Sequence, residues 1–225
     1  MTRKASAPPT SRKAARTLAG AAVFAIPALA VASPNTDLLL NGDFSNGLEQ
    51  WNVRGDVVAQ SGAAVISERD GSLTSALSQS FSVTGSLARI SFDLEFESTG
   101  DNNGSLFNDS LFVTLLDAAT LQPIVNNPGT DDFLFIDADG VSQSVQQRLA
   151  SNGATFTLDL FGIPLAGRDL LLGFQLAGFD DGRNSSVRID NVSAVSRVIP
   201  LPGPALLAAA GVVAVAAPRR RRDRD

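Results

Sequence analysis

The chain has 225 residues and a formal net charge of −5, and it contains no cysteine, histidine or tyrosine. These absences exclude disulfide bonds, cysteine or Ser-His-Asp nucleophilic chemistry, and histidine-ligated zinc or iron. The charge is unevenly distributed, because residues 33–197 hold eight arginines against 21 acidic residues, a net charge of −13. A domain this acidic repels nucleic acid, so no nucleic-acid partner is expected.

Residues 1–32 have the order of a secretory signal peptide. Five basic residues lie before position 17, the apolar run TLAGAAVFAIPALAVA follows, and Ala30-Val31-Ala32 places small residues before a cleavage point near Ser33. We predict a signal helix that enters the Sec translocon and is removed by signal peptidase. The alternative is an uncleaved anchor helix, which Pro27 and the shortness of the run disfavour.

Residues 33–197 are predicted to form one all-β domain with two packed sheets. In ARISFDLEFES, residues 88–98, apolar and polar side chains alternate with period two, as in a strand with one buried face. Further short strand-like segments follow, separated by Gly, Asn, Asp and Ser, which favours a β-sandwich. Residues 141–153 are the best candidate for one short helix. The other predicted strands are residues 110–116, 131–137, 155–161, 169–178 and 186–195.

The stretch LLLNGDFSNGLEQWNV, residues 38–53, is the most informative of this domain. It predicts a strand over residues 38–40, a turn at Asn41-Gly42, and a second strand opening at Trp51. Together with the strand Val187-Arg188-Ile189-Asp190-Asn191-Val192, it resembles the galactose-binding-domain-like jelly rolls, including the carbohydrate-binding modules found beside xylanases and glucanases. The resemblance implies a two-sheet jelly-roll sandwich in which the two ends of the domain meet.

The same resemblance implies a structural calcium ion, the only cofactor that we expect. Position by position, Asp43 would offer mainly its carbonyl and Asp190 its carboxylate, with an acid from the turn SERDGS, Glu68 or Asp70. Ser45 stands where the family usually has Glu and is a weaker ligand. The alternative is that Asp43 and Asp190 accept hydrogen bonds from nearby backbone amides.

The aromatic and acidic residues bear on activity. Trp51, the only tryptophan, is predicted to fill the core under the first loop, which leaves neither Trp nor Tyr as a sugar platform. Asp93, Glu95 and Glu97 share one strand face, but a glycosidase needs two carboxyls across a cleft with aromatic subsites. We therefore expect no catalytic residue, and interpret the three acids as a solvated strand face.

A second polar motif lies in residues 97–115. Asp101, Asn102, Asn103, Asn108 and Asp109 form an oxygen-rich cluster before a predicted strand. The prediction is a solvated connection between two strands. The alternative is a site that holds a cation or hydrogen-bonds a sugar.

The C-terminal segment, residues 198–225, has three parts. Pro200-Leu201-Pro202 precedes the apolar residues 205–217, and Arg219, Arg220, Arg221 and Arg222 follow. As a helix, the apolar part would reach about 20 Å, which makes a short transmembrane helix of marginal length. The order resembles the PEP-CTERM sorting signals of Gram-negative bacteria, closest to the VPLPA-type variant, and implies processing by exosortase. The alternative is a plain tail anchor.

These features predict an exported, non-catalytic protein of the cell surface or the exopolysaccharide matrix, with polysaccharide as a partner. The chain would pass through an intermediate anchored in the inner membrane of a Gram-negative bacterium before exosortase acts. One alternative function is a carbohydrate-binding module that recognises a specific glycan, and a second is a glycosidase-like enzyme.

Overall fold

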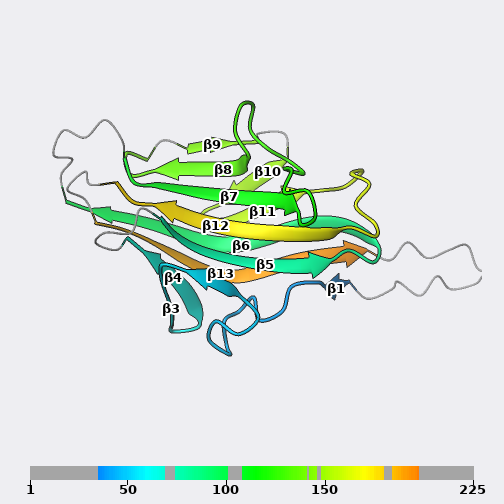
Figure 1. Ribbon diagram of the computed structural model, residues 1–225, viewed down its shortest axis with the longest axis horizontal. Coiled ribbons are helices and arrows are strands. Elements are labelled where there is room, and N and C mark those ends of the chain that lie inside the picture. The colour runs from blue at the N-terminus through cyan, green and yellow to red at the C-terminus, as the bar shows by residue number, and fades with distance from the viewer. Residues whose placement is uncertain are drawn as a thin grey trace, which may run out of the picture. The chain divides into compact units, whose positions relative to one another are not determined.

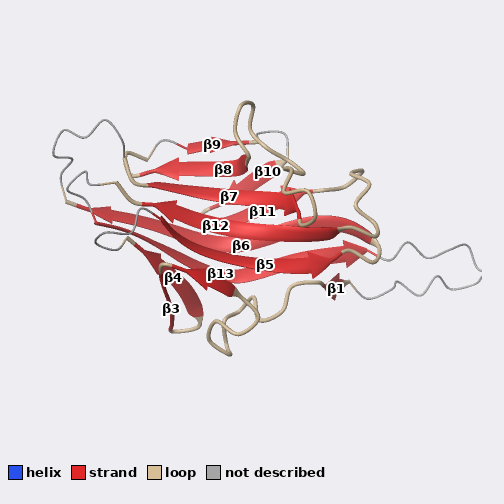
Figure 2. Ribbon diagram, viewed as in Figure 1, coloured by secondary structure: helices blue, strands red, loops and turns tan. Residues whose placement is uncertain are grey.

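The computed structural model describes residues 35–68, 74–100, 108–140, 142–145, 148–179 and 184–197, all within one compact unit, Val31–Leu201. These ranges contain strands and no helix (Figure 1 and Figure 2). Within them, no helix has the length and hydropathy that a membrane crossing requires. The predicted signal helix and the sorting segment, with Pro200, Leu201, Pro202 and Arg219–Arg222, lie outside the described residues.

The strands form two antiparallel sheets, as the alternating segments predict. We call them sheet A and sheet B. In both, strands distant in the sequence are neighbours; β6 pairs with β13 along nearly its whole length. Sheet A has the order β10 (Leu149–Asn152), β11 (Thr155–Asp159), β6 (Ser86–Thr99), β13 (Asn184–Arg197), β4 (Ala63–Ser67), β3 (Asp56–Gln60), with β1 (Thr36–Asp37) also on β13. Sheet B has the order β2 (Asn52–Arg54), β5 (Thr74–Ser82), β12 (Asp169–Ala177), β7 (Ser110–Asp117), β8 (Asp132–Asp137), β9 (Ser142–Ser144).

One hydrophobic core joins the two sheets. Phe92 of β6 is fully buried, and its ring lies 5.2 Å from that of Phe174 on β12 and 6.3 Å from that of Phe133 on β8. These contacts cross from sheet A to sheet B, so the sheets pack face to face. Each such aromatic side chain contributes on the order of 1.5–3 kcal/mol by its burial. The all-β, two-sheet prediction is therefore confirmed for the described residues.

The alternation predicted for residues 88–98 is present in β6. Ile90, Phe92 and Leu94 point into the core, whereas Asp93 and Glu95 lie on the outer face of sheet A. Consecutive side chains of a strand alternate between the two faces of the sheet. The buried residues of a strand, which we call its inward row, therefore show on which face each of the other side chains lies. This parity places the site residues described below.

The two ends of the domain meet, as the resemblance implied. The backbone N–H of Val192 on β13 donates to the carbonyl of Gly42 over 2.9 Å, and β1 pairs with the end of β13. Residue 42 must be glycine, because a Cβ there would lie 1.8 Å from the Val192 carbonyl oxygen. Asn41 adopts the left-handed conformation, φ 52°, which asparagine tolerates better than most residues. The turn dipeptide is thus explained by close backbone approach.

The strand predicted over residues 38–40 is wrong, because β1 ends at Asp37. The N–H of Leu39 donates to the Asp37 carboxylate and that of Leu40 to the side chain of Gln79. With both donors satisfied by side chains, this segment needs no neighbouring strand and can turn Leu39 into the core. Trp51 directly precedes β2, as predicted.

The helix predicted over residues 141–153 is also wrong. Residues 142–144 form β9 on the edge of sheet B, and residues 149–152 form β10, which pairs with β11. The dipeptide Gly153-Ala154 makes the turn between β10 and β11, with Gly153 at φ 65°. Pairing with neighbouring strands therefore overrides the helix propensity of Gln, Arg, Leu and Ala in this stretch.

Candidate functional site

The outer face of sheet A gathers pockets and charged side chains. On this face, Asp93 lies directly opposite Asp190, and Glu95 opposite Arg188, in the pairing of β6 with β13. Three pockets in the described part of the chain are lined by these residues and their neighbours on β11, β4 and the end of β3. We call this surface the sheet A face.

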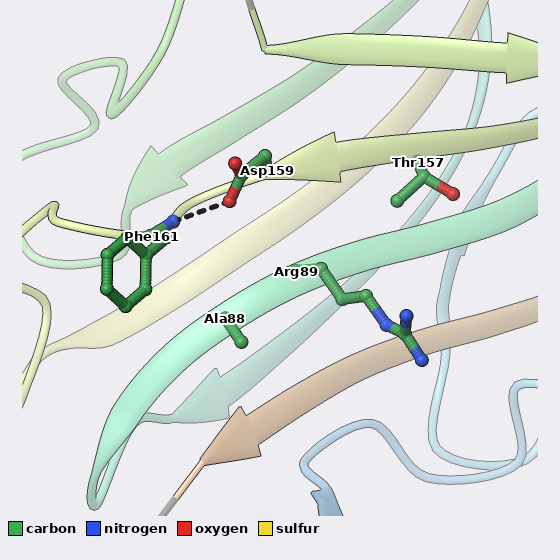
Figure 3. A pocket seen from close by; sticks show the side chains of 5 residues that line it. All are labelled: Ala88, Arg89, Thr157, Asp159 and Phe161. Atoms are coloured by element: carbon green, nitrogen blue, oxygen red, sulfur yellow. Dashed lines mark hydrogen bonds between the residues drawn. The ribbon is translucent and has the colours of Figure 1, made fainter. Parts of the chain in front are cut away.

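The largest of the three pockets, about 360 Å³, lies between β6 and β11. It is lined by Ala88 and Arg89 from β6, and by Thr157, Asp159 and Phe161 from β11 and the residues after it (Figure 3). Phe161 is 70% exposed, the most exposed of the large hydrophobic side chains in the described ranges. A pocket lined by an aromatic ring, a guanidinium, a hydroxyl and a carboxylate combines an apolar surface with donors and acceptors.

Local hydrogen bonds fix the backbone at Phe161. Asp159 accepts a hydrogen bond from the Phe161 N–H over 2.8 Å, which turns the chain as β11 ends (Figure 3). Gly162, at φ 83°, follows and completes the turn. The guanidinium of Arg148 donates to the carbonyl of Asp159 over 3.2 Å, and tightens the turn from outside. The exposed ring therefore projects from a turn whose backbone is fixed.

A smaller pocket of about 180 Å³ lies further along β6 and contains Asp93, Glu95, Arg188 and Asp190. Both carboxylate oxygens of Asp93 accept hydrogen bonds, one from Thr155 Oγ1 at 2.6 Å and one from Asn191 Nδ2 at 2.7 Å. The pairing of β6 and β13 shifts register after Asp190, and the bulge brings Asn191 to φ 51°. This bulge aims the Asn191 amide at Asp93.

Arg188 connects this region to the third pocket, of about 240 Å³. Its guanidinium donates to the carbonyls of Gln60 and Ser61, each over 3.3 Å, and so fixes the turn between β3 and β4. Glu95 and Glu97 line the same pocket, and lie on the outer face as the sequence predicted. The three acids of β6 thus lie on a polar surface whose hydrogen bonds are largely structural.

The residues predicted to hold calcium are only partly brought together. Asp43 and Ser45 lie in the exposed turn beside Val192, and Asp190 is on β13 two residues before Val192. Glu68 lies next to Ser185. Ser185 precedes Asp190 by five residues on β13, which separates the two by about 16 Å along the strand. Asp70 is outside the described residues. Glu68 therefore cannot share an ion with Asp190, and calcium at Asp43, Ser45 and Asp190 remains a prediction.

The alternative reading of the two aspartates fits their hydrogen bonds. Asp43 Oδ1 accepts from the Ser45 N–H at 3.2 Å and from Ser45 Oγ at 3.0 Å. The first of these bonds is the main reason why the pKa of Asp43 is lower than usual. Asp190 Oδ1 accepts from the Asn191 N–H at 2.6 Å. The described ranges hold no group of three or more acidic side chains arranged for a metal ion.

Trp51 is buried, as predicted. Its ring lies 5.3 Å from that of Phe44 and 6.4 Å from that of Phe174, and its Nε1 donates to the Asn41 carbonyl over 3.1 Å. It therefore fills the core, and does not present a surface for a ligand.

Sequence reasoning missed the pocket of Phe161 and Arg89. A signal for it exists in TFTLDLF, where Phe156, Leu158 and Leu160 form the inward row of β11 and its continuation. Phe161 follows Leu160 directly and falls on the other face. An aromatic residue out of phase with the core row is thus the feature that marks this pocket.

Comparisons with known proteins find only distant structural likenesses. No family model matches the sequence, and no curated protein matches it. Among solved structures, TmCBM61 in complex with β-1,4-galactotriose has a TM-score of 0.39 and 14% identity, over 72% of this chain and 99% of that one. TmCBM27, a carbohydrate-binding module that recognises mannan, has a TM-score of 0.34 and 13% identity, over 75% and 98%. At these scores the likeness does not extend to what this chain binds.

Proposed function

We propose that this chain is an exported, non-catalytic protein of the cell surface or exopolysaccharide matrix, and that its β-sandwich contacts glycan through the sheet A face. The observation that supports this most is the pocket between β6 and β11, which is lined by the exposed ring of Phe161 together with Arg89, Thr157 and Asp159. A sugar ring offers C–H groups to an aromatic face and hydroxyls to polar side chains. The pocket supplies both, at a volume typical of small-ligand sites.

The negative charge of the sheet A face favours a neutral glycan over an anionic one. Asp93, Glu95, Glu97 and Asp190 lie on the two central strands of this face, and Arg188 is the one cation paired directly with them in the register of β6 and β13. An anionic polysaccharide would approach carboxylates at close range, which is unfavourable. Neutral hydroxyls can instead donate hydrogen bonds to these acids.

The hydrogen bonds of Asp93 support a non-catalytic role. A glycosidase needs one carboxyl free to protonate or attack and a second across the sugar. Asp93 is held on both oxygens by Thr155 and Asn191, and Asp190 accepts from its own neighbour. Phe161, the exposed aromatic residue in the described part of this face, lines the pocket between β6 and β11, and Asp93 does not line that pocket.

The location in this proposal depends on the two terminal segments of the sequence. The signal-like residues 1–32 and the sorting-like residues 198–225 would deliver the acidic domain outside the cell, with exosortase as the processing enzyme. The intact mass of the exported protein tests this. Loss of residues 1–32 and of Arg219–Arg222 is expected, and a species that retains the four arginines would contradict processing.

Glycan contact is tested with two exposed hydrophobic residues. The wild-type chain, Phe161→Ala and Leu121→Ala would be run in affinity gels containing neutral or anionic polysaccharides. Leu121 is 59% exposed but lies in the connection after β7 in sheet B, so its variant is a matched control. We expect retardation by a neutral polysaccharide that Phe161→Ala loses and Leu121→Ala keeps. Equal retardation of all three chains would contradict the assignment.

A dedicated carbohydrate-binding module is the second candidate, and the lining of the pocket favours it. A pocket that combines one aromatic ring with polar side chains suits a short stretch of one sugar better than an undefined matrix. Saturable binding of a single oligosaccharide would establish this candidate. Weak binding that scales with polymer length would favour the matrix protein.

A further inference from the structure

One end of the sandwich interior is polar. The inward rows of four strands are apolar along most of their length, and each finishes in an oxygen-bearing side chain at this end. The rows are those of β6, β13, β4 and β7, and the last inward residues are Ser98, Ser185, Glu68 and Asp109. A fifth row, that of β12, finishes in Gly178. We call these five residues the polar end.

Contacts show that four of these residues lie together. Ser98 and Ser185 are direct partners in the pairing of β6 and β13. Glu68 accepts from the Ser185 N–H at 3.4 Å through Oε2, and its own N–H donates to the Ser185 carbonyl. A Cβ on Gly178 would lie 2.6 Å from Glu68 Cγ, so the glycine leaves room for the Glu68 side chain. This contact joins sheet A to sheet B.

Asp109 completes the cluster from sheet B. Its Oδ1 accepts from the N–H of Phe179, the residue after Gly178, at 2.7 Å. Asp109 is fully buried, and its Oδ2 has no hydrogen-bond partner. The prediction that this residue belongs to a solvated connection is therefore wrong for Asp109. Asn108 is half-buried, and Asp101, Asn102 and Asn103 lie outside the described residues.

The unpaired groups are confined to this end. In the described ranges, the buried side-chain oxygens without a hydrogen-bond partner are Asp109 Oδ2, Ser98 Oγ and Ser185 Oγ, and all belong to the polar end. An unpaired buried polar atom costs about 1–3 kcal/mol, and more when it is charged. Such atoms in a native protein usually mark a water or an ion. Three of them in one cluster point to a shared occupant.

We propose that the polar end binds a hard divalent cation of the calcium type, through the Asp109 and Glu68 carboxylates and the Ser98 and Ser185 hydroxyls. Water could satisfy the hydroxyls but would not neutralise a buried carboxylate, whereas a cation does both. The site needs only two acids, because calcium accepts hydroxyl, carbonyl and water oxygens as well. It is separate from the turn of Asp43 and from the sheet A face, and does not depend on the proposed glycan contact.

The proposal is tested by calcium titration of the full-length chain, with calorimetry and with thermal melting in CaCl₂ and in EDTA. Asp109→Asn keeps the shape of the side chain and removes its charge. Asp131→Asn is the matched control, since Asp131 is exposed and adjoins β8. We expect calcium to bind and to raise the melting temperature of the wild type, and Asp109→Asn to lower the affinity at least about tenfold. Asp131→Asn should leave the affinity unchanged.

Two further variants keep the test decisive. The double variant Ser98→Ala/Ser185→Ala removes two ligands without changing any charge, and should weaken calcium binding even if Asp109→Asn does not fold. Asp43→Asn separates this site from the turn beside Val192, and should leave the affinity unchanged. The proposal is overturned by a wild type that binds no calcium, or by binding that Asp43→Asn abolishes while Asp109→Asn retains it.

Discussion

The turn of residues 41–51 and the polar end both bring polar groups into the sandwich interior, and they differ in how those groups are satisfied. At the turn of residues 41–51, Gln79 is almost fully buried, and its side chain bonds to the N–H and carbonyl of Leu40 and to the carbonyl of Gln50. Trp51 Nε1 bonds to Asn41 in the same turn. At the polar end, Asp109, Ser98 and Ser185 each keep an unpaired oxygen.

This difference separates structure from binding. A closed network such as that of Gln79 stabilises the fold by itself, because every buried group has a protein partner. An open cluster destabilises the fold until something enters it. Variants at the first place should therefore lower stability under all conditions. The effect of a variant at the second place on stability should change sign when the cation is added.

Trp51→Ala should have the largest effect. The substitution removes the ring contacts with Phe44 and Phe174 and leaves a cavity in the core. We expect a loss of about 3–5 kcal/mol in the free energy of unfolding, measured by urea denaturation. Val53→Ala on β2, where the side chain is 45% exposed, should lose far less. A Trp51→Ala loss below about 1 kcal/mol would show that the turn does not depend on this ring.

Gln79→Ala should come next, because it opens the closed network. The N–H of Leu40 and the carbonyls of Leu40 and Gln50 lose their partner. We expect a loss of about 2–3 kcal/mol in urea denaturation, with or without calcium. Gln175→Ala is the control, since Gln175 is exposed on β12 and should change stability by less than about 0.5 kcal/mol. Equal effects of the two variants would break the comparison.

In EDTA, Asp109→Asn should stabilise the protein, whereas the two preceding variants destabilise it. Without a cation, the substitution removes a buried charge whose Oδ2 has no partner, and should raise the free energy of unfolding by about 1 kcal/mol. In calcium, the wild type should become the more stable of the two. The measurement is the urea midpoint of both chains in each condition. A variant less stable than the wild type in EDTA would count against the open character of the cluster.

The smallest effect concerns pH on the exposed side of the first turn. The Ser45 N–H and hydroxyl lower the pKa of Asp43 below its ordinary value of 3.8. A carboxyl with a lowered pKa in the folded state adds stability above the unfolded pKa, and loses it as the pH falls through the folded pKa. Wild type should therefore lose slightly more stability than Asp43→Asn between about pH 5 and 2. Parallel curves of unfolding free energy against pH for the two chains would show that Asp43 makes no such contribution.

The sequence predicted the parts of the fold that follow from local alternation. Residues 88–98 read correctly as β6, because one buried face imposes period two on the side chains. Residues 38–40 and 141–153 were predicted wrongly, because side-chain hydrogen bonds from Gln79 in one case and strand pairing in the other decided their structure.

The candidate sites were less predictable, since they depend on contacts between distant segments. Phe161 and Arg89 line one pocket only because β11 pairs with β6. Asp109 looks like a loop residue in the sequence, and only the position of Phe179 and the parity of β7 show that it points inward. Trp51 could be placed in the core beforehand because its motif predicts a turn directly above it.

The glycan-contacting role of the sheet A face is tested most directly by NMR titration of the isotope-labelled chain. The ligand is a neutral oligosaccharide from the polysaccharide that retards the chain in the affinity gels. The proposal predicts chemical-shift changes centred on Arg89, Thr157, Asp159 and Phe161. The outward residues of β5 in sheet B, Ser78 and Ser80, should be unaffected. Shift changes centred on β5, with the signals of Arg89 and Phe161 unmoved, would contradict it.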